Sequence, residues 1–241
     1  AEWIVHCLGG TPHSEASLMS RTGGLDVVQG NEYRDVFAWA GVPDLRFGQI
    51  VGAGEPAATA VNGPAALRGA TLTVAGLDCY TSAHVIGIDA SHTALLSCGT
   101  SGAAIRVLDE WLTPPEIRRA VALDFTLDRF VDGIRPAILG ATPCGLILQP
   151  LMDMLGHPRQ VGGTSSQVAG EATDELWRRA FEAVADGEAR LIRDLRSFEG
   201  DLRQVVAVGG WIAQPRLRSA LERRLGDLIA YADATTAADG A

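Results

Sequence analysis

The chain has 241 residues, enough for one large domain or parts of two. Hydrophobic residues make up 47% and charged residues 20%, which predicts a folded protein with a sizeable core rather than a disordered one. The formal net charge of −9 argues against nucleic acid as the main partner, because binding to phosphate backbones needs a basic surface. All 20 basic residues are arginine, so a Walker A lysine and a Schiff-base lysine are excluded.

The four cysteines are Cys7, Cys79, Cys98 and Cys144, and they lack C-x-x-C spacing. Neither a zinc site nor a disulfide framework is therefore predicted, and we expect reduced, mostly buried thiols in a cytoplasmic protein. No apolar run has the length of a membrane span, and no signal peptide is visible. Both ends look cut, because the first residues resemble the inside of a helix and the last ones stop where another should begin.

The first 70 residues predict short elements rather than one regular layer. In order, we expect the end of a helix, a hydroxyl-rich loop, an amphipathic helix, an irregular crossing and a short helix, at 1–10, 11–30, 33–40, 49–61 and 62–68. Glycines close the first and last of these helices. We place a lobe boundary near Arg68, which gives an N-terminal part of residues 1–68 and a C-terminal part of residues 69–241.

Residues 71–106 carry the strongest pattern. Three strand-like runs and one short helical segment are expected at 71–74, 93–98, 103–108 and 82–88. Asp78 follows the first run, and Gly99-Thr100-Ser101-Gly102 forms a tight turn between the other two. A lone carboxylate near a turn rich in backbone N–H groups and hydroxyls suits phosphoryl transfer. Spacing alone leaves Asp78 open as a plain helix N-cap, and His84 and His92 lack metal-ligand spacing.

The remaining chain predicts helices around one buried strand. Helical or amphipathic segments are expected at 112–123, 125–131, 146–155 (after Pro150), 171–198 and 215–225, with a turn at 141–145 and a mobile loop at 157–170. The buried strand Gln204–Val208 leads into Gly209-Gly210 and then a helix that begins with Pro215. Strand, double glycine and helix start suit a nucleotide, although an ordinary tight strand–helix turn remains the alternative.

Four segments resemble one family in order and spacing. They are SLMSRTGGLDVVQGNEYRDVFAWAGVP (17–43), VAGLDCYTSAHVIG (74–87), LLSCGTSGAAI (95–105) and VVAVGGWIAQPRLRSALERRLG (205–226). Together they resemble the FGGY carbohydrate kinases, members of the actin-like ATPase superfamily, over most of the chain. The resemblance implies an α/β fold, with a ribonuclease H-like lobe and the remnant of an N-terminal lobe.

The resemblance also implies roles for single residues. Asp78 matches the catalytic base, which takes the proton of a sugar hydroxyl as that hydroxyl attacks the γ-phosphate of Mg-ATP. The implied ATP-binding residues are Gly99, Thr100, Ser101, Gly209, Gly210, Trp211 and Gln214. No protein ligand to a metal is expected, since Mg²⁺ would be held mainly by ATP and water. The implied substrate is a xylulose-like sugar, a gluconate-like sugar acid or a polyol, with no nucleic acid or membrane partner, and a homodimer stays open.

The sequence also departs from the family pattern. Trp211 replaces the third glycine of the adenosine motif, Gln214 replaces its usual serine, and the N-terminal D-x-G-T phosphate motif is absent. Trp211 and the missing lobe favour a rival interpretation, a non-catalytic actin-like nucleotide-binding or scaffold protein. A Rossmann-type dehydrogenase is a weaker rival, because no G-x-G-x-x-G run is present.

Overall fold

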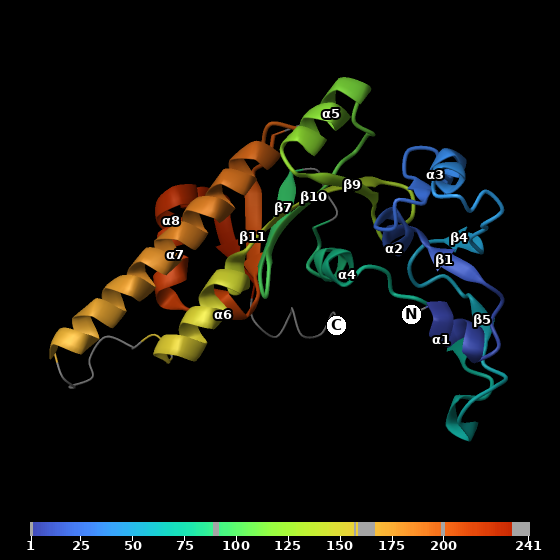
Figure 1. Ribbon diagram of the computed structural model, residues 1–241, viewed down its shortest axis with the longest axis horizontal. Helices are drawn as coiled ribbons and strands as arrows, with labels where there is room; N and C mark the ends of the chain where they lie inside the picture. Colours follow the sequence, from blue (N-terminus) through green and yellow to red (C-terminus); the bar gives the residue numbers. More distant parts are fainter. Residues whose placement is uncertain (1, 89–91, 157, 159–166, 199–200, 233–241) are drawn as a thin grey trace.

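A six-stranded mixed sheet forms the centre of the protein (Figure 1). The computed structural model describes residues 2–88, 92–156, 158, 167–198 and 201–232. The strand order is β12-β11-β7-β8-β10-β9, with β11 parallel to both of its neighbours and the other pairs antiparallel. The strands are β7 (Thr93–Cys98), β8 (Gly102–Val107), β9 (Thr126–Arg129), β10 (Pro136–Thr142), β11 (Gln204–Val208) and β12 (Ile229–Tyr231).

Helices cover both faces of this sheet. Figure 1 shows α6, α7 and α8 on one side and α4 on the other, and each face has its own buried cluster of apolar side chains. The helices are α4 (Asp78–Val85), α5 (Pro114–Ala122), α6 (Cys144–Leu155), α7 (Gln167–Leu195) and α8 (Pro215–Leu225), with short 3₁₀ turns η2 (Gly210–Ala213) and η3 (Gly226–Leu228). Because the central strands are buried on both faces, they are nearly continuous apolar runs.

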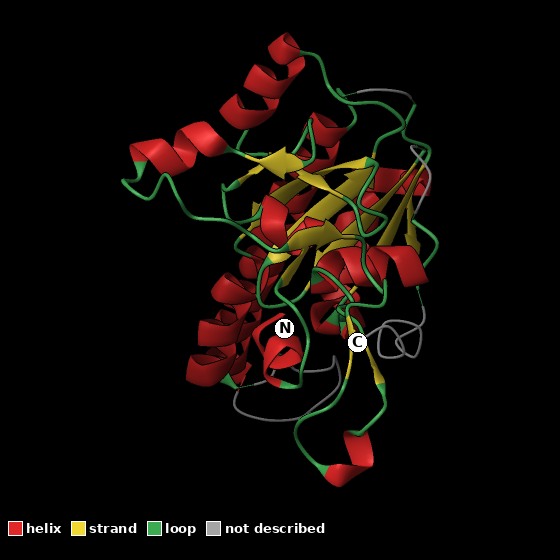
Figure 2. Ribbon diagram, turned by 90° about the vertical axis from the view of Figure 1, so that its right-hand side faces the viewer, coloured by secondary structure: helices red, strands yellow, loops and turns green. Residues whose placement is uncertain are grey.

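Short elements make up the N-terminal segment. They are α1 (Glu2–Cys7), β1 (His13–Glu15), α2 (Ala16–Ser20), β2 (Leu25–Asp26), β3 (Asn31–Glu32), α3 (Arg34–Trp39), β4 (Gln49–Val51), β5 (Ala58–Thr59), η1 (Ala65–Leu67) and β6 (Thr71–Leu72). They form three two-stranded sheets, and the β5–β6 ribbon projects from the rest with η1 at its tip (Figure 2). Because β5 pairs with β6 across residue 68, a lobe boundary there would separate paired strands. The boundary stays a prediction.

Several expectations for the chain were wrong. Residues 11–30 are not a loop, because β1, α2 and β2 lie within them. The Glu15 side chain starts α2 by accepting hydrogen bonds from the backbone N–H groups of Ser17 (3.0 Å) and Leu18 (2.9 Å), a role more often filled by a shorter polar side chain. Likewise, α6 begins at Cys144 rather than after Pro150, and that proline lies inside the helix.

The C-terminal boundary of the loop expected at 157–170 was also wrong. Helix α7 begins at Gln167, three residues before that loop was expected to finish. Of the earlier part of the loop, the structure describes only residue 158, so most of this expectation lies outside the described residues. The strands β7 and β11 and the helix α8 have the bounds expected from the sequence.

Buried Asp128 on β9 joins the N-terminal segment to the central sheet. Its carboxylate is 1% exposed and accepts hydrogen bonds from Tyr80 Oη on α4 (2.5 Å), Arg21 Nη1 (2.9 Å) and Thr126 Oγ1 (3.3 Å). Burial, followed by the Asp128 charge, raises the pKa of Tyr80 well above its usual range, so the phenol is a donor at neutral pH. One carboxylate therefore connects three segments that are far apart in the sequence.

We expect Asp128→Ala to lower the free energy of unfolding by about 2–4 kcal/mol, because Tyr80 and Arg21 lose their acceptor. A loss near the lower end of this range is expected, because the Arg21 side chain is 37% exposed and solvent weakens its ion pair with Asp128. Urea unfolding measures the change. Asp201→Ala is the matched control, since the Asp201–Arg203 pair is 68% exposed on both sides and should change stability by less than about 0.5 kcal/mol. Equal losses in the two variants would contradict a structural role for the Asp128 network.

Candidate nucleotide and phosphate site

Three strands end at the same edge of the central sheet. Strands β7 and β11 run parallel, with Val208 paired to Ser97, so their carboxyl ends meet. Strand β10 runs antiparallel to β8, with Thr142 paired to Gly102, which brings its carboxyl end to the same edge. The turn after β7, the glycines after β11 and the start of α6 after β10 therefore lie together. In open α/β sheets, ligands bind at this kind of edge.

Glycine is required where these segments touch. A Cβ atom on Gly209, whose φ is +105°, would lie 2.5 Å from the Cys98 carbonyl oxygen. A Cβ atom on Gly145, in the first turn of α6, would lie 2.4 Å from the Gly99 carbonyl oxygen and 2.8 Å from Thr100 Cα. Any side chain at either position would push the turn away. The turn predicted to hold phosphate is thus packed between two glycines from other elements.

The edge is open to solvent above these contacts. Thr100, Ser101, Gly209 and Gly210 are exposed, and Gly99 is half-buried. A Cβ atom on Gly210 would have no atom within 4 Å among the described residues. The 12-residue helix α6 begins where β10 reaches this edge, and the first N–H groups of a helix have no partner within the helix. A helix start at such an edge suits an anion.

The structure contains a hollow near the start of α8. It has a volume of about 620 Å³ and lies between α7 and α8. Its lining includes Asp174, Phe181, Pro215 and Arg216. Pro215 directly follows Gln214, so the hollow begins where the predicted ATP-binding segment ends.

The two remaining predicted ATP-binding residues lie in the segment between Gly210 and α8. Trp211 lies in η2, is half-buried and packs against the larger apolar cluster. Gln214 is half-buried between η2 and α8, and its side chain makes no capping hydrogen bond to α8. The structure therefore places Trp211 largely in packing. An ATP contact for either side chain stays a prediction.

Asp78 is the first residue of α4, and Leu77 occupies the N-cap position. Its carboxylate is exposed and accepts a hydrogen bond from the backbone N–H of Cys79 (2.7 Å). The N-cap role that spacing left open for Asp78 is therefore wrong, because Leu77 is the N-cap and the Asp78 side chain accepts only the N–H of the next residue. Buried Tyr80, two residues later, fixes this end of α4 through Asp128. The carboxylate is free to meet a ligand, and its catalytic role stays a prediction.

The sequence interpretation missed Glu188, which lies under the turn. It is 0% exposed, accepts a hydrogen bond from Thr142 Oγ1, and leaves no room for a Cβ at Gly102, which would lie 2.0 Å from Oε1. Burial raises the pKa of Glu188 to about 7. A charged residue four positions after Val184 and four before Ile192 interrupts an apolar helix stripe, and that signal was available in the sequence.

The titration of Glu188 gives a pH dependence of stability. Because its pKa is raised in the folded state, stability is highest below about pH 4.5 and falls as pH rises through about 7. Between pH 5 and 8 the ionisation of Glu188 should lower the free energy of unfolding by about 2–3 kcal/mol. In Glu188→Gln this part of the pH dependence should be absent. Urea unfolding of both proteins at the two pH values, with a chelator present, measures the difference. Parallel pH profiles would contradict the raised pKa.

This arrangement defines a mixed α/β lobe of the ribonuclease H-like type, as expected from the sequence. Its solved neighbours include carbohydrate kinases of the FGGY family. They include a xylulose kinase from Rhodospirillum rubrum (18% identity, TM-score 0.73, 100% of this chain and 56% of that one) and a gluconate kinase from Lactobacillus acidophilus (14%, 0.67, 100% and 56%). A third is a Plasmodium falciparum glycerol kinase with ADP (11%, 0.71, 92% and 51%).

At these identities the likeness establishes a shared fold, and the resemblance inferred from the sequence is confirmed at that level. The chain spans little more than half the length of these kinases. No protein-family model matches the sequence, and no curated protein matches it. Within the described ranges, every helix is too short or too polar to cross a membrane.

Proposed function

We propose that this chain belongs to an FGGY-type carbohydrate kinase, which transfers the γ-phosphate of Mg-ATP to a hydroxyl group of a sugar, sugar acid or polyol. The observation that carries the proposal is the glycine-lined edge where β7, β10 and β11 end. The kinase fold of the solved neighbours supports it. Residues 69–241 would form the nucleotide-binding lobe, and residues 1–68 would be the end of the sugar-binding lobe.

In this proposal, the exposed turn Gly99–Ser101 holds the β- and γ-phosphate oxygens through backbone N–H groups and hydroxyls. Gly209 and Gly210 border the ribose and the α-phosphate, and the hollow between α7 and α8 takes the adenosine end. Magnesium enters with ATP as part of the substrate. The close packing of Gly145 and Gly209 on the turn keeps these groups in place before ATP arrives, and such preorganisation supplies most of the catalysis in phosphoryl transfer.

Asp78 would act as the general base. A sugar hydroxyl is a weak nucleophile, and a carboxylate within hydrogen-bond reach accepts its proton as the oxygen attacks phosphorus. The exposure of Asp78 at the start of α4 supports this role, because the carboxylate is accessible to a ligand. Tyr80 and Asp128 would keep that helix end from shifting.

The test is ADP formation by the complete protein with ATP and a panel of pentuloses, gluconate and glycerol. We expect at least one alcohol to stimulate ADP formation and to be recovered as its phosphate. The rival is a nucleotide-binding or scaffold protein without transfer activity, which Trp211 favours because it replaces a glycine of the family pattern. Tight nucleotide binding with no phosphorylated product across the panel would support that rival.

A further inference from the structure

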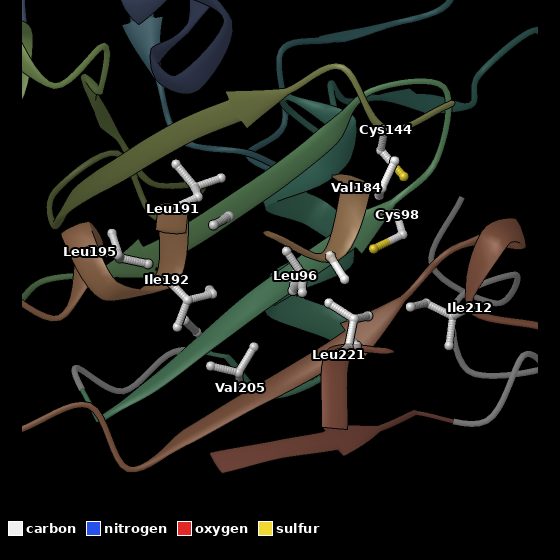
Figure 3. Packing of buried hydrophobic residues seen from close by; sticks show 14 of the residues in the cluster. Leu96, Cys98, Cys144, Val184, Leu191, Ile192, Leu195, Val205, Ile212 and Leu221 are labelled. Carbon is white, nitrogen blue, oxygen red and sulfur yellow. The ribbon is translucent and has the colours of Figure 1, made fainter. Parts of the chain in front are cut away.

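Two cysteines meet under the glycine turn although their spacing in the sequence gave no sign of it. Cys98 ends β7, and Cys144 is the first residue of α6. Figure 3 shows both within the buried cluster beside Leu96 and Val184. Both are buried, with exposures of 0% and 1%. The hydrogen bond with Cys144, followed by burial, raises the pKa of the Cys98 thiol well above its usual range.

The carboxyl group of Glu188 completes this cluster. One ligand atom from each of Cys98, Cys144 and Glu188 lies within 4.8 Å of the other two. Glu188 Oε1 accepts the Thr142 hydroxyl, whereas the buried Oε2 has no hydrogen-bond partner among the described residues. A buried polar atom without a partner is costly, and a carboxylate oxygen of Glu188 lies within 4.8 Å of both sulfur atoms. Oε2 therefore has a lone pair to offer to a cation between the thiols.

We propose that Cys98, Cys144 and Glu188 form a binding site for a Zn²⁺-class divalent cation beneath the glycine turn. Two thiolates select a soft or borderline ion over Mg²⁺ or Ca²⁺, which prefer all-oxygen ligands. Tetrahedral Zn²⁺ holds sulfur and oxygen ligands about 3.5–3.8 Å apart. The three ligand atoms are within 4.8 Å of one another, so side-chain shifts of about 1 Å close the site. Thr142 orients the carboxylate from outside the ligand set, as partners of metal ligands commonly do.

The three ligands determine how many protons metal binding releases and what net charge the occupied site carries. Binding releases up to three protons, two from the thiols and one from the carboxyl group, because metal ligands must be deprotonated. The ion brings two positive charges to three negative ones, and the N-terminus of α6 at Cys144 offsets part of the remainder. Since the three ligands come from β7, α6 and α7, the bound ion would cross-link the elements that support the turn.

The test uses Co²⁺ as a spectroscopic probe for Zn²⁺ in the complete protein, kept reduced and freed of metal with a chelator that is then removed. We expect a thiolate-to-cobalt charge-transfer band that saturates at one ion per chain and is displaced by Zn²⁺. Zn²⁺ should also raise the unfolding temperature. Cys98→Ser, Cys144→Ser and Glu188→Gln should each weaken binding by more than about 100-fold, beyond the 10–100-fold effect typical of outer-shell changes. The controls Cys7→Ser and Glu175→Gln alter an exposed thiol and a carboxylate of α7 whose side chain is 41% exposed, and both variants should bind normally.

Several results would overturn the proposal. Absence of the band in the unaltered protein means that no such site exists. A band that survives both Cys98→Ser and Cys144→Ser belongs to other thiols, and one lost in the cysteine variants but kept at full affinity in Glu188→Gln removes the carboxylate from the site. If one serine variant fails to fold, the other two variants still decide. Because the readout is metal binding, it is independent of whether the protein phosphorylates a sugar.

Discussion

Replacing Asp78 with asparagine should slow sugar phosphorylation by the complete protein by about 10²–10⁴-fold, the share that a general base contributes. Nucleotide affinity and thermal stability should stay unchanged, because the side chain is exposed and an asparagine oxygen can still accept the Cys79 N–H. Steady-state kinetics with the best substrate of the panel, together with nucleotide titration, measure the two effects separately. A loss confined to turnover is what a missing proton acceptor predicts.

The matched control is Asp109→Asn. Asp109 is exposed and follows β8, whose carboxyl end lies at the opposite edge of the sheet. Its replacement should leave turnover and affinity unaltered. If Asp78→Asn kept full activity, or lost nucleotide binding together with activity, the assignment of Asp78 as the base would fail.

Gly209→Ala should have the second large effect, on both stability and nucleotide binding. Its Cβ would lie 2.5 Å from the Cys98 carbonyl, and its φ of +105° is unfavourable for alanine. Steric overlap and backbone strain together should cost about 2–4 kcal/mol in the free energy of unfolding. Because Cys98 leads directly into Gly99, relief of the overlap moves the phosphate turn. We expect nucleotide affinity to fall by about tenfold or more, equivalent to about 1.4 kcal/mol.

The neighbouring glycine supplies the control for this prediction. Gly210→Ala adds the same methyl group where no described atom lies within 4 Å, and its φ is not in the left-handed region. Urea unfolding and nucleotide titration of both variants distinguish two effects. One is the steric displacement of the turn, and the other is the general effect of replacing a glycine with alanine. Equal effects of the two substitutions, or normal nucleotide affinity in a destabilised Gly209→Ala, would contradict the role given to this contact.

The sequence predicted the elements whose boundaries are marked by glycine or proline. Strands β7 and β11 stop at Gly99 and Gly209, and α8 starts at Pro215, so local chemistry fixed these bounds. Strand β10 was missed, because a strand buried on both faces lacks alternation and this one begins with proline and contains Gly140. Pro150 suggested a helix start but lies in the middle of α6.

The candidate site was predicted only in part, for a physical reason. The turn after β7 and the glycines after β11 were recognised as separate segments, and parallel pairing explains why they meet. The contribution of α6 depends on β10, so its contact with the turn through Gly145 could not be seen without that strand. The cluster of Cys98, Cys144 and Glu188 likewise draws on three elements that no local spacing connects.

The account depends on one claim, that the turn at 99–101, the glycines at 209–210 and Asp78 face a single bound nucleotide. A crystal structure of the complete protein with a non-hydrolysable ATP analogue tests it most directly. We predict that the β- and γ-phosphate oxygens accept hydrogen bonds from the backbone of residues 99–101, with the ribose beside Gly209 and the Asp78 carboxylate facing the terminal phosphate. An analogue bound elsewhere, or an Asp78 side chain directed away from the phosphates, would contradict the account.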